Sequence, residues 1–120
     1  MNNDIIICPI ESTLKVLNRK WTIVLIRDMF NGKKYFHEFN ENKKELSNTV
    51  LSDTLKNMEK NELIIKKDNE YHLTSRGIKL NKILYEMAIF GLDELECGGN
   101  GDLEIINMFK DYYKNLLKVE

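Results

Sequence analysis

The stretch from Leu46 to Leu63, LSNTVLSDTLKNMEKNEL, constrains the fold more than any other part of the chain. Ser47 is a favoured helix N-cap, because its hydroxyl can accept a hydrogen bond from a free amide of the first turn. Leu51, Leu55 and Met58 then recur at spacings of four and three, which places them on one face of a helix. The pattern predicts an amphipathic helix whose other face is polar.

Two short strands are expected directly after this helix. Ile64 to Lys67 and Glu70 to Leu73 are separated by Asp68-Asn69, and both turn residues tolerate the left-handed backbone of a tight hairpin. A helix followed by a hairpin is the element order of a winged helix-turn-helix. The expected fold class is therefore mainly α with a small β-hairpin, a winged helix-turn-helix with N- and C-terminal dimerisation helices.

The polar face of the predicted helix carries short hydrogen-bonding side chains and lysines, which suit base edges in a DNA major groove. A solvated surface is the commoner explanation for one such helix, but the hairpin that follows favours DNA binding. The candidate base contacts are Asn48, Thr49, Ser52 and Lys56. The candidate phosphate contacts are Lys43 and Lys44 in the turn before the helix, and Lys66 and Lys67 on the first strand.

The remaining patterns fit a single domain over residues 1–120, with residues 9–80 as the DNA-binding core and 81–120 as dimerisation helices. A short helix is indicated by Phe36 and Phe39, and further helices are expected from Pro9 to near Asn18, Trp21 to Phe30, Ser75 to about Leu95, and Asp102 to about Lys118. The last two carry wide apolar bands, which exceed the needs of one small core. We therefore expect a homodimer on an inverted-repeat operator, and a thicker monomer core is the alternative.

The net charge of −1 hides an asymmetry along the chain. Residues 14–34 carry six basic side chains against one acidic, whereas residues 84–120 carry three basic against eight acidic. A basic first half can meet phosphate while the acidic second half faces away. No stretch is long and apolar enough to cross a membrane, and residues 5–7 lack the basic flank of a signal peptide, so a cytoplasmic protein is expected.

With these elements in place, the chain resembles the HxlR family of winged helix-turn-helix transcriptional regulators, which are MarR-like. The matching motifs run from residue 8 to about residue 80 and comprise Cys8-Pro9, Lys20-Trp21, Phe36-His37-Glu38-Phe39, the pattern Ser47, Leu51, Leu55, Met58, Glu59 and Leu63, and the pattern Tyr71, Leu73, Thr74, Gly77 and Leu80. The resemblance implies a homodimeric repressor or activator whose N-terminal cysteine, in several members, senses oxidants or electrophiles. The chain departs from the family with Asn18-Arg19 for a glycine pair, Glu62 for a glycine, and a short acidic hairpin loop.

Cys8 and Cys97 are the candidate redox-sensing residues. Cys8 precedes the first amides of a predicted helix, which favour a thiolate, and an inert buried thiol is the alternative. Cys97 precedes a glycine-rich break at residues 98–101, at the edge of the expected dimer interface. Oxidised Cys8 is therefore expected to pair with Cys97 of the partner subunit, in a transient regulatory disulfide.

Two other function classes stay open at this point. One is a thiol-dependent enzyme with Cys8 as nucleophile, although Glu11 in the same turn opposes a thiolate and no histidine is near in sequence. The other is a helical protein–protein adaptor. No metal site or cofactor is expected, because His37 and His72 are far apart and neither cysteine belongs to a CxxC pair. A small electrophile, or an apolar ligand between the C-terminal helices, is a further candidate partner.

Overall fold

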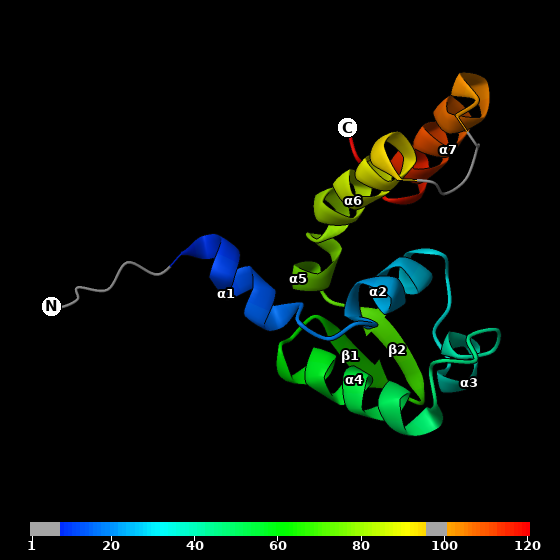
Figure 1. The fold of residues 1–120 in the computed structure, drawn as a ribbon. Coiled ribbons are helices and arrows are strands. Elements are labelled where there is room, and N and C mark those ends of the chain that lie inside the picture. Colours follow the sequence, from blue (N-terminus) through cyan, green and yellow to red (C-terminus); the bar gives the residue numbers. More distant parts are fainter. Residues whose placement is uncertain (1–7, 96–100) are drawn as a thin grey trace, which may run out of the picture.

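The structure, a computed structural model, describes residues 8–95 and 101–120. The described elements run in the order α1 (Pro9–Val16), α2 (Thr22–Phe30), α3 (Phe36–Phe39), α4 (Asn48–Lys60), β1 (Ile64–Lys67), β2 (Glu70–Leu73), α5 (Ser75–Ile78), α6 (Asn81–Glu94) and α7 (Leu103–Leu116). Figure 1 shows α2, α3, α4 and the hairpin grouped at one end, and α6 with α7 at the other. The predicted succession of helix, turn, helix and hairpin is confirmed.

The core forms around α2. Leu25 and Ile26 are fully buried, and they belong to one cluster with Phe39 of α3. The same cluster contains the buried face of α4 and side chains that follow it, namely Leu51, Leu55, Met58, Leu63 and Ile64. Gly32, at φ +97°, adopts the left-handed backbone just beyond α2 and ends this helix where the sequence predicted.

The hairpin has the predicted strands and turn. β1 pairs antiparallel with β2 from Ile64 opposite Leu73 to Lys67 opposite Glu70. The two turn residues, Asp68 and Asn69, have φ values of 52° and 66°. A two-residue turn with both φ values positive matches the right-handed twist of the strands.

The segment before α3 joins this sheet, which sequence patterns did not predict. The Tyr71 amide donates to the Lys34 carbonyl at 2.7 Å, and Tyr35 forms an isolated bridge with Glu70. These contacts fasten the hairpin to the start of α3 over a separation of 35 residues.

Glu62 ends α4 in a conformation that normally favours glycine. Its φ is +62°, and its amide donates to the Glu59 carbonyl at 2.9 Å. The Leu63 amide donates to the Met58 carbonyl at 3.0 Å, which completes the paired bonds of a Schellman motif. The Thr74 hydroxyl donates to the Glu62 carbonyl at 2.6 Å, so the end of α4 is also tied to the segment after β2.

The prediction of one continuous helix from Ser75 to about Leu95 is wrong. The chain turns at Lys79 and Leu80 and divides this stretch into α5 and α6. A Cβ at Gly77 would lie 2.2 Å from the Leu63 carbonyl oxygen, so α5 lies directly against the backbone that follows α4. Because Leu80 must also enter the core, the chain bends there before α6 departs, as Figure 1 shows.

The C-terminal helices pack on each other, whereas α1 projects from the molecule (Figure 1). Asn81 at the start of α6 donates to the Leu117 carbonyl at 2.9 Å, and Lys110 of α7 pairs with Asp93 of α6 at 2.8 Å. Every residue of α1 is exposed or partly exposed, and the helix ends at Val16 rather than near Asn18. Within the described ranges, no helix combines the length and apolar character needed to span a membrane.

Candidate nucleic-acid interface

One face of α4 packs against the core, and the opposite face points outward. The Ser47 hydroxyl accepts from the Val50 amide at 3.2 Å, which caps the first turn. Leu51, Leu55 and Met58 beneath it are 1 % exposed or less. The cap and the buried stripe together set the orientation of the polar face.

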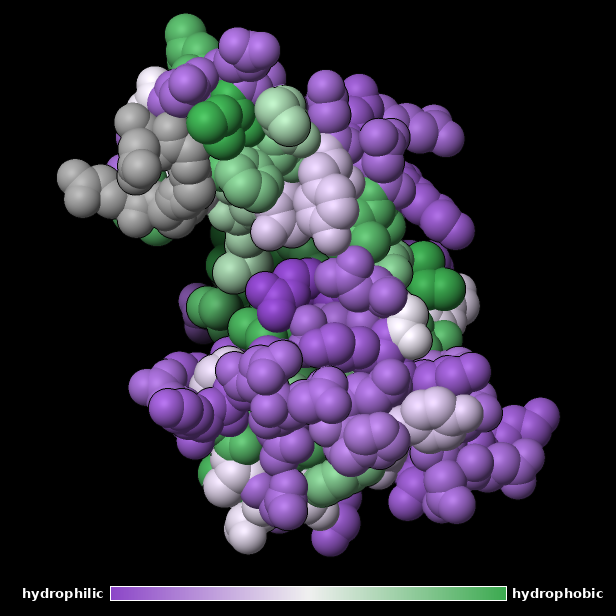
Figure 2. Space-filling model, turned by 90° about the vertical axis from the view of Figure 1, so that its right-hand side faces the viewer, coloured by the Kyte–Doolittle hydropathy of each residue, from purple (hydrophilic) through white to green (hydrophobic). Residues whose placement is uncertain are grey.

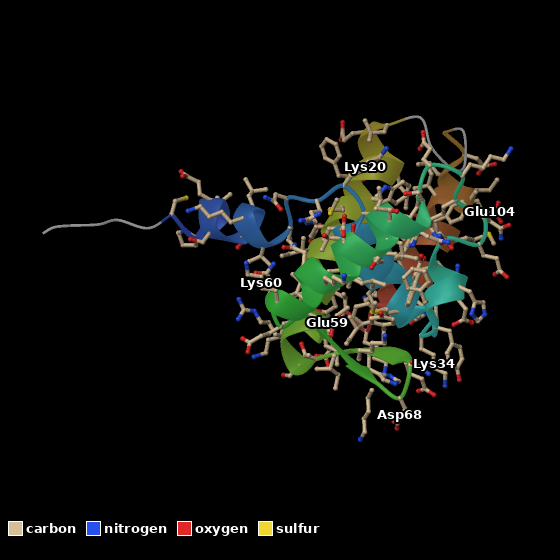
Figure 3. The ribbon with its side chains drawn as sticks, turned by 90° about the horizontal axis from the view of Figure 1, so that it is seen from below. Lys20, Lys34, Glu59, Lys60, Asp68 and Glu104 are labelled. Carbon is tan, nitrogen blue, oxygen red and sulfur yellow. The ribbon has the colours of Figure 1, made fainter. Side chains whose placement is uncertain are left out.

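The four predicted base-contacting side chains lie on this outward face. Asn48, Thr49 and Lys56 are exposed, and Ser52 is partly exposed. Asp53 is exposed beside them. In the view from below, α4 crosses the front of the molecule, with Glu59 and Lys60 toward one end (Figure 3). The structure thus gathers these side chains on one surface, and their contact with bases stays a prediction.

Two further side chains of α4 were missed by the sequence patterns. Val50 is 42 % exposed, and an apolar side chain on such a surface can contact the methyl group of thymine. The sequence could have indicated its exposure, because Val50 lies outside the stripe of Leu51, Leu55 and Met58. Thr54 is buried at 2 % exposure, and its hydroxyl donates to the Val50 carbonyl at 2.8 Å, which satisfies the buried polar group.

Asn40 links α3 to the first residue of α4. Its side-chain amide donates to the Asn48 side-chain oxygen at 2.7 Å. Asn48 therefore faces outward from a fixed position, with one acceptor lone pair already engaged. Asn40 was not among the candidate site residues, because nothing in the local pattern pairs it with a residue eight positions away.

Lys43 lies in the expected turn, but its ammonium is engaged inside the protein. It donates to Asp28 Oδ2 at 2.8 Å and to the Phe39 carbonyl at 3.1 Å. Arg27 donates to the other Asp28 oxygen at 2.9 Å, and the Asp28 side chain is only 3 % exposed. An unpaired buried carboxylate is strongly unfavourable, so Asp28 retains both cations. Lys43 therefore ties the turn to α2, and its predicted phosphate contact stays a prediction.

The other three predicted phosphate-contacting lysines have exposed side chains. Lys44 lies in the turn before α4, and Lys66 and Lys67 lie on β1. The Lys66 ammonium lies 5.5 Å from the centre of the Tyr71 ring, a cation–π contact that orients its chain. The hairpin therefore presents positive charge at the strand rather than at its acidic tip.

The carboxylate of Glu70 is engaged by three neighbouring side chains. His72 Nε2 lies 2.9 Å from one carboxylate oxygen, the Tyr35 hydroxyl donates to the other at 3.3 Å, and Lys34 Nζ lies 3.8 Å away. The hydrogen bond from His72, followed by the charge of Lys34, lowers the pKa of Glu70 below its ordinary value. Asp68 at the tip is exposed, and it is the acidic group of the hairpin outside this network.

Of the two predicted sensor cysteines, Cys8 lies within the described residues. Cys8 is a partly exposed free thiol at the N-cap of α1. Cys97 and the glycine-rich break at 98–100 lie outside the described residues. His37 and His72 are both exposed, as expected. Over residues 8–95 and 101–120, no three side chains of the metal-binding types are grouped to hold a metal ion.

Comparison with known proteins decides the family. Residues 16–97 match the family model described as HxlR-like helix-turn-helix. The chain belongs to this family. Related proteins are transcriptional regulators of the helix-turn-helix type, so the chain is a DNA-binding regulator rather than a thiol-dependent enzyme.

Relatives in Bacillus subtilis match most of this HxlR-like chain. The HTH-type transcriptional regulator YdeP is 27 % identical over 111 residues, which cover 82 % of this chain and 87 % of YdeP. The quinone-bound structure of YodB has a TM-score of 0.63 at 30 % identity and covers 71 % of this chain and 97 % of YodB. The reduced form of YodB has a TM-score of 0.61 at 26 % identity, with 76 % and 97 % covered.

Proposed function

We propose that this HxlR-like regulator acts in the cytoplasm as a homodimer that reads an inverted-repeat operator. The observation that carries the proposal is the exposed polar face of α4 beside the lysines of β1. Two copies of α4 would enter successive major grooves about 34 Å apart. Asn48, Thr49, Ser52 and Lys56 would face base edges, and Lys44, Lys66 and Lys67 would bind phosphates.

Two kinds of substitution separate base reading from phosphate binding. Ser52→Ala and Lys56→Ala should weaken operator binding more than random-DNA binding, by about 1 to 3 kcal/mol for a bidentate contact. Lys67→Ala should weaken both DNAs alike and reduce the salt dependence. Lys114→Ala, on the C-terminal helix α7, is the matched control.

Unchanged operator affinity in folded, dimeric Ser52→Ala and Lys56→Ala would count against α4 as the reading helix. A protein that acts only as a protein–protein adaptor would show no salt-dependent gel shift.

The proposed dimer uses the apolar surface of the N- and C-terminal helices. Ile10 and Leu14 of α1 are 72 % and 59 % exposed, and an isolated helix of eight residues is not stable in water. Large apolar side chains are also exposed on the last two helices, namely Ile83, Met87, Phe90, Leu103, Ile105, Met108, Phe109 and Tyr112. Figure 2 shows hydrophobic surface over part of the upper end, beside hydrophilic surface at the right, and a mainly hydrophilic lower part. We therefore assign residues 9–80 to DNA binding and 81–120, with α1, to dimerisation.

A groove of about 440 Å³ runs between α1, α2 and α6 within this surface. It is lined by apolar side chains, including Leu14, Ile83 and Met87. We assign it to packing of the partner subunit rather than to a separate apolar ligand, because the same side chains form the proposed interface.

We further infer that Cys8 responds to oxidants or electrophiles. Cys8 is partly exposed at the N-cap of the projecting α1, so small reagents can reach its sulfur. The quinone named in the YodB structure is an electrophile of the relevant class. A thiolate adding to a quinone ring forms one S–C bond, and the ring becomes the hydroquinone after taking up a proton. With peroxide, the thiolate becomes a sulfenic acid as hydroxide leaves, and a second thiol then releases water and forms a disulfide.

Cys97 is the proposed second thiol, supplied by the partner subunit. Non-reducing electrophoresis after mild peroxide treatment should show a covalent dimer that is lost with Cys8→Ser and with Cys97→Ser. Competitive alkylation should label Cys8 faster than Cys97. A cross-link that survives Cys97→Ser would remove Cys97 from the mechanism, and slower labelling of Cys8 would remove the sensor role.

A further inference from the structure

A hollow of about 280 Å³ lies where the hairpin meets the start of α3. Tyr35, Phe36 and His37 line one side of it. Lys66, Asn69 and Tyr71 of the hairpin line the other. In the view from below, Lys34 and Asp68 mark this side of the molecule (Figure 3). We call this hollow the wing cleft.

Contacts between the two sides hold the wing cleft open in a defined shape. The Tyr71 amide donates to the Lys34 carbonyl at 2.7 Å, and the Tyr35 hydroxyl donates to Glu70 at 3.3 Å. The Tyr35 and His37 rings are nearly parallel, with centroids 6.0 Å apart and planes 7° apart. The cleft is therefore built before any ligand arrives, which reduces the entropy lost on binding.

The polar groups that line the wing cleft suit an anion. Lys66 and Asn69 supply donors, and the ring of His37 supplies a further one. Two nearby carboxylates, Glu38 and Glu70, are engaged elsewhere, whereas Asp68 at the hairpin tip is exposed. Glu38 accepts from the amides of Lys34 and Tyr35, at 2.9 Å each, and Glu70 is bound within its own network.

We infer that the wing cleft seats a phosphodiester group of the bound DNA strand, with His37, Lys66 and Asn69 as its donors. The inference rests on the proposed function, because it requires α4 and the hairpin to lie against DNA. Phosphate groups are recognised by lysines, amides and other side-chain donors, and such contacts fix the position of a protein on the duplex. Tyr35 positions the cleft through Glu70 rather than contacting the phosphate.

The test measures binding of a DNA duplex by fluorescence anisotropy against salt concentration. Lys66→Gln should reduce the slope of log affinity against log salt by about 0.9, the value for one lost phosphate contact. Lys114→Gln, with the same change of charge on α7, should leave the slope unchanged. An unchanged slope for Lys66→Gln would overturn the assignment.

The histidine substitutions separate the two histidines of the chain. His37→Ala removes a donor from the wing cleft and should weaken DNA binding, whereas His72→Gln, outside the lining of the cleft, should retain wild-type affinity. Wild-type affinity in His37→Ala would overturn the role of His37.

Two outcomes separate this inference from the proposed function. Wild-type protein that binds no DNA at low salt would overturn the proposed function and the wing cleft together. Wild-type protein that binds DNA, with a reduced salt slope in Lys66→Gln and full affinity in His37→Ala, would leave the proposed function intact and overturn the wing cleft alone. If inorganic phosphate replaces chloride at constant ionic strength, it should weaken wild-type binding more than that of Lys66→Gln, because it competes with the DNA phosphodiester for the cleft.

Discussion

Glu62 carries backbone strain that glycine would relieve. Its φ of +62° places a side chain in the left-handed region, which costs about 1 to 2 kcal/mol for residues other than glycine. Glu62→Gly should therefore raise the free energy of unfolding by about 1 kcal/mol, measured by urea denaturation. Glu62→Ala is the matched control, because it removes the charge and keeps the strained Cβ. Equal gains in both variants would trace the effect to charge instead.

Gly77 is required for a different reason, which is space. A Cβ there would lie 2.2 Å from the Leu63 carbonyl oxygen, and that backbone atom cannot move without disturbing the end of α4. Gly77→Ala should destabilise the fold by about 3 kcal/mol, at the upper end of overpacking effects, and should weaken DNA binding. The added Cβ of Gly32→Ala meets open space, so only its positive φ matters and the loss should be about 1 kcal/mol. Similar losses in the two urea titrations would contradict this distinction.

At the scale of elements, α3 depends on a carboxylate that caps the chain before it. The amides of Lys34 and Tyr35 donate to Glu38, and these bonds lower the pKa of Glu38 below its ordinary 4.5. A depressed folded-state pKa means that ionised Glu38 stabilises the fold above pH 4.5 and that this contribution disappears as pH falls through the lowered pKa. Glu38→Gln should therefore lower stability at pH 7 and flatten the loss on the acid side. Glu41→Gln, an exposed neighbour, should retain the wild-type profile in urea titrations at a series of pH values.

Elements with local signals were predicted well, and those set by distant contacts were not. Ser47 and the leucine stripe identify α4, and Asp68-Asn69 identifies the hairpin turn, because each signal lies within the element itself. The bend before α6 depends on Leu63, whose backbone excludes a side chain at position 77. The wing cleft depends likewise on contacts between α3 and a hairpin about 35 residues away.

The candidate site follows the same division between local and distant information. The outward face of α4 was predictable, since helical periodicity separates it from the buried stripe. The engagement of Lys43 was not, because its partner Asp28 is 15 residues away and looked like one acidic residue in a basic segment. Sequence spacing cannot show which lysine meets a buried carboxylate and which one remains exposed.

At the scale of the whole molecule, polar and apolar surfaces lie at different ends. The lower part, with the hairpin and α3, is mainly hydrophilic, and hydrophobic surface gathers toward α6 and α7 (Figure 2). This arrangement lets one protomer bind DNA with one end and a second protomer with the other. The exposed side of α1 adds to the second surface, because its apolar residues also lack cover within the described chain.

Leu14 provides the sharpest test of that arrangement. Its side chain is 59 % exposed within one chain, so Leu14→Glu should leave the protomer fold and its urea midpoint nearly unchanged. In the proposed dimer the same side chain is covered, and an unpaired buried charge is strongly unfavourable. The variant should sediment as a monomer at micromolar concentration and should bind a full operator no more tightly than a single half-site. Ile78→Glu, a charge introduced at a 49 % exposed side chain of α5, should remain dimeric. A dimeric Leu14→Glu protein would exclude α1 from the interface and leave α6 and α7 to form it.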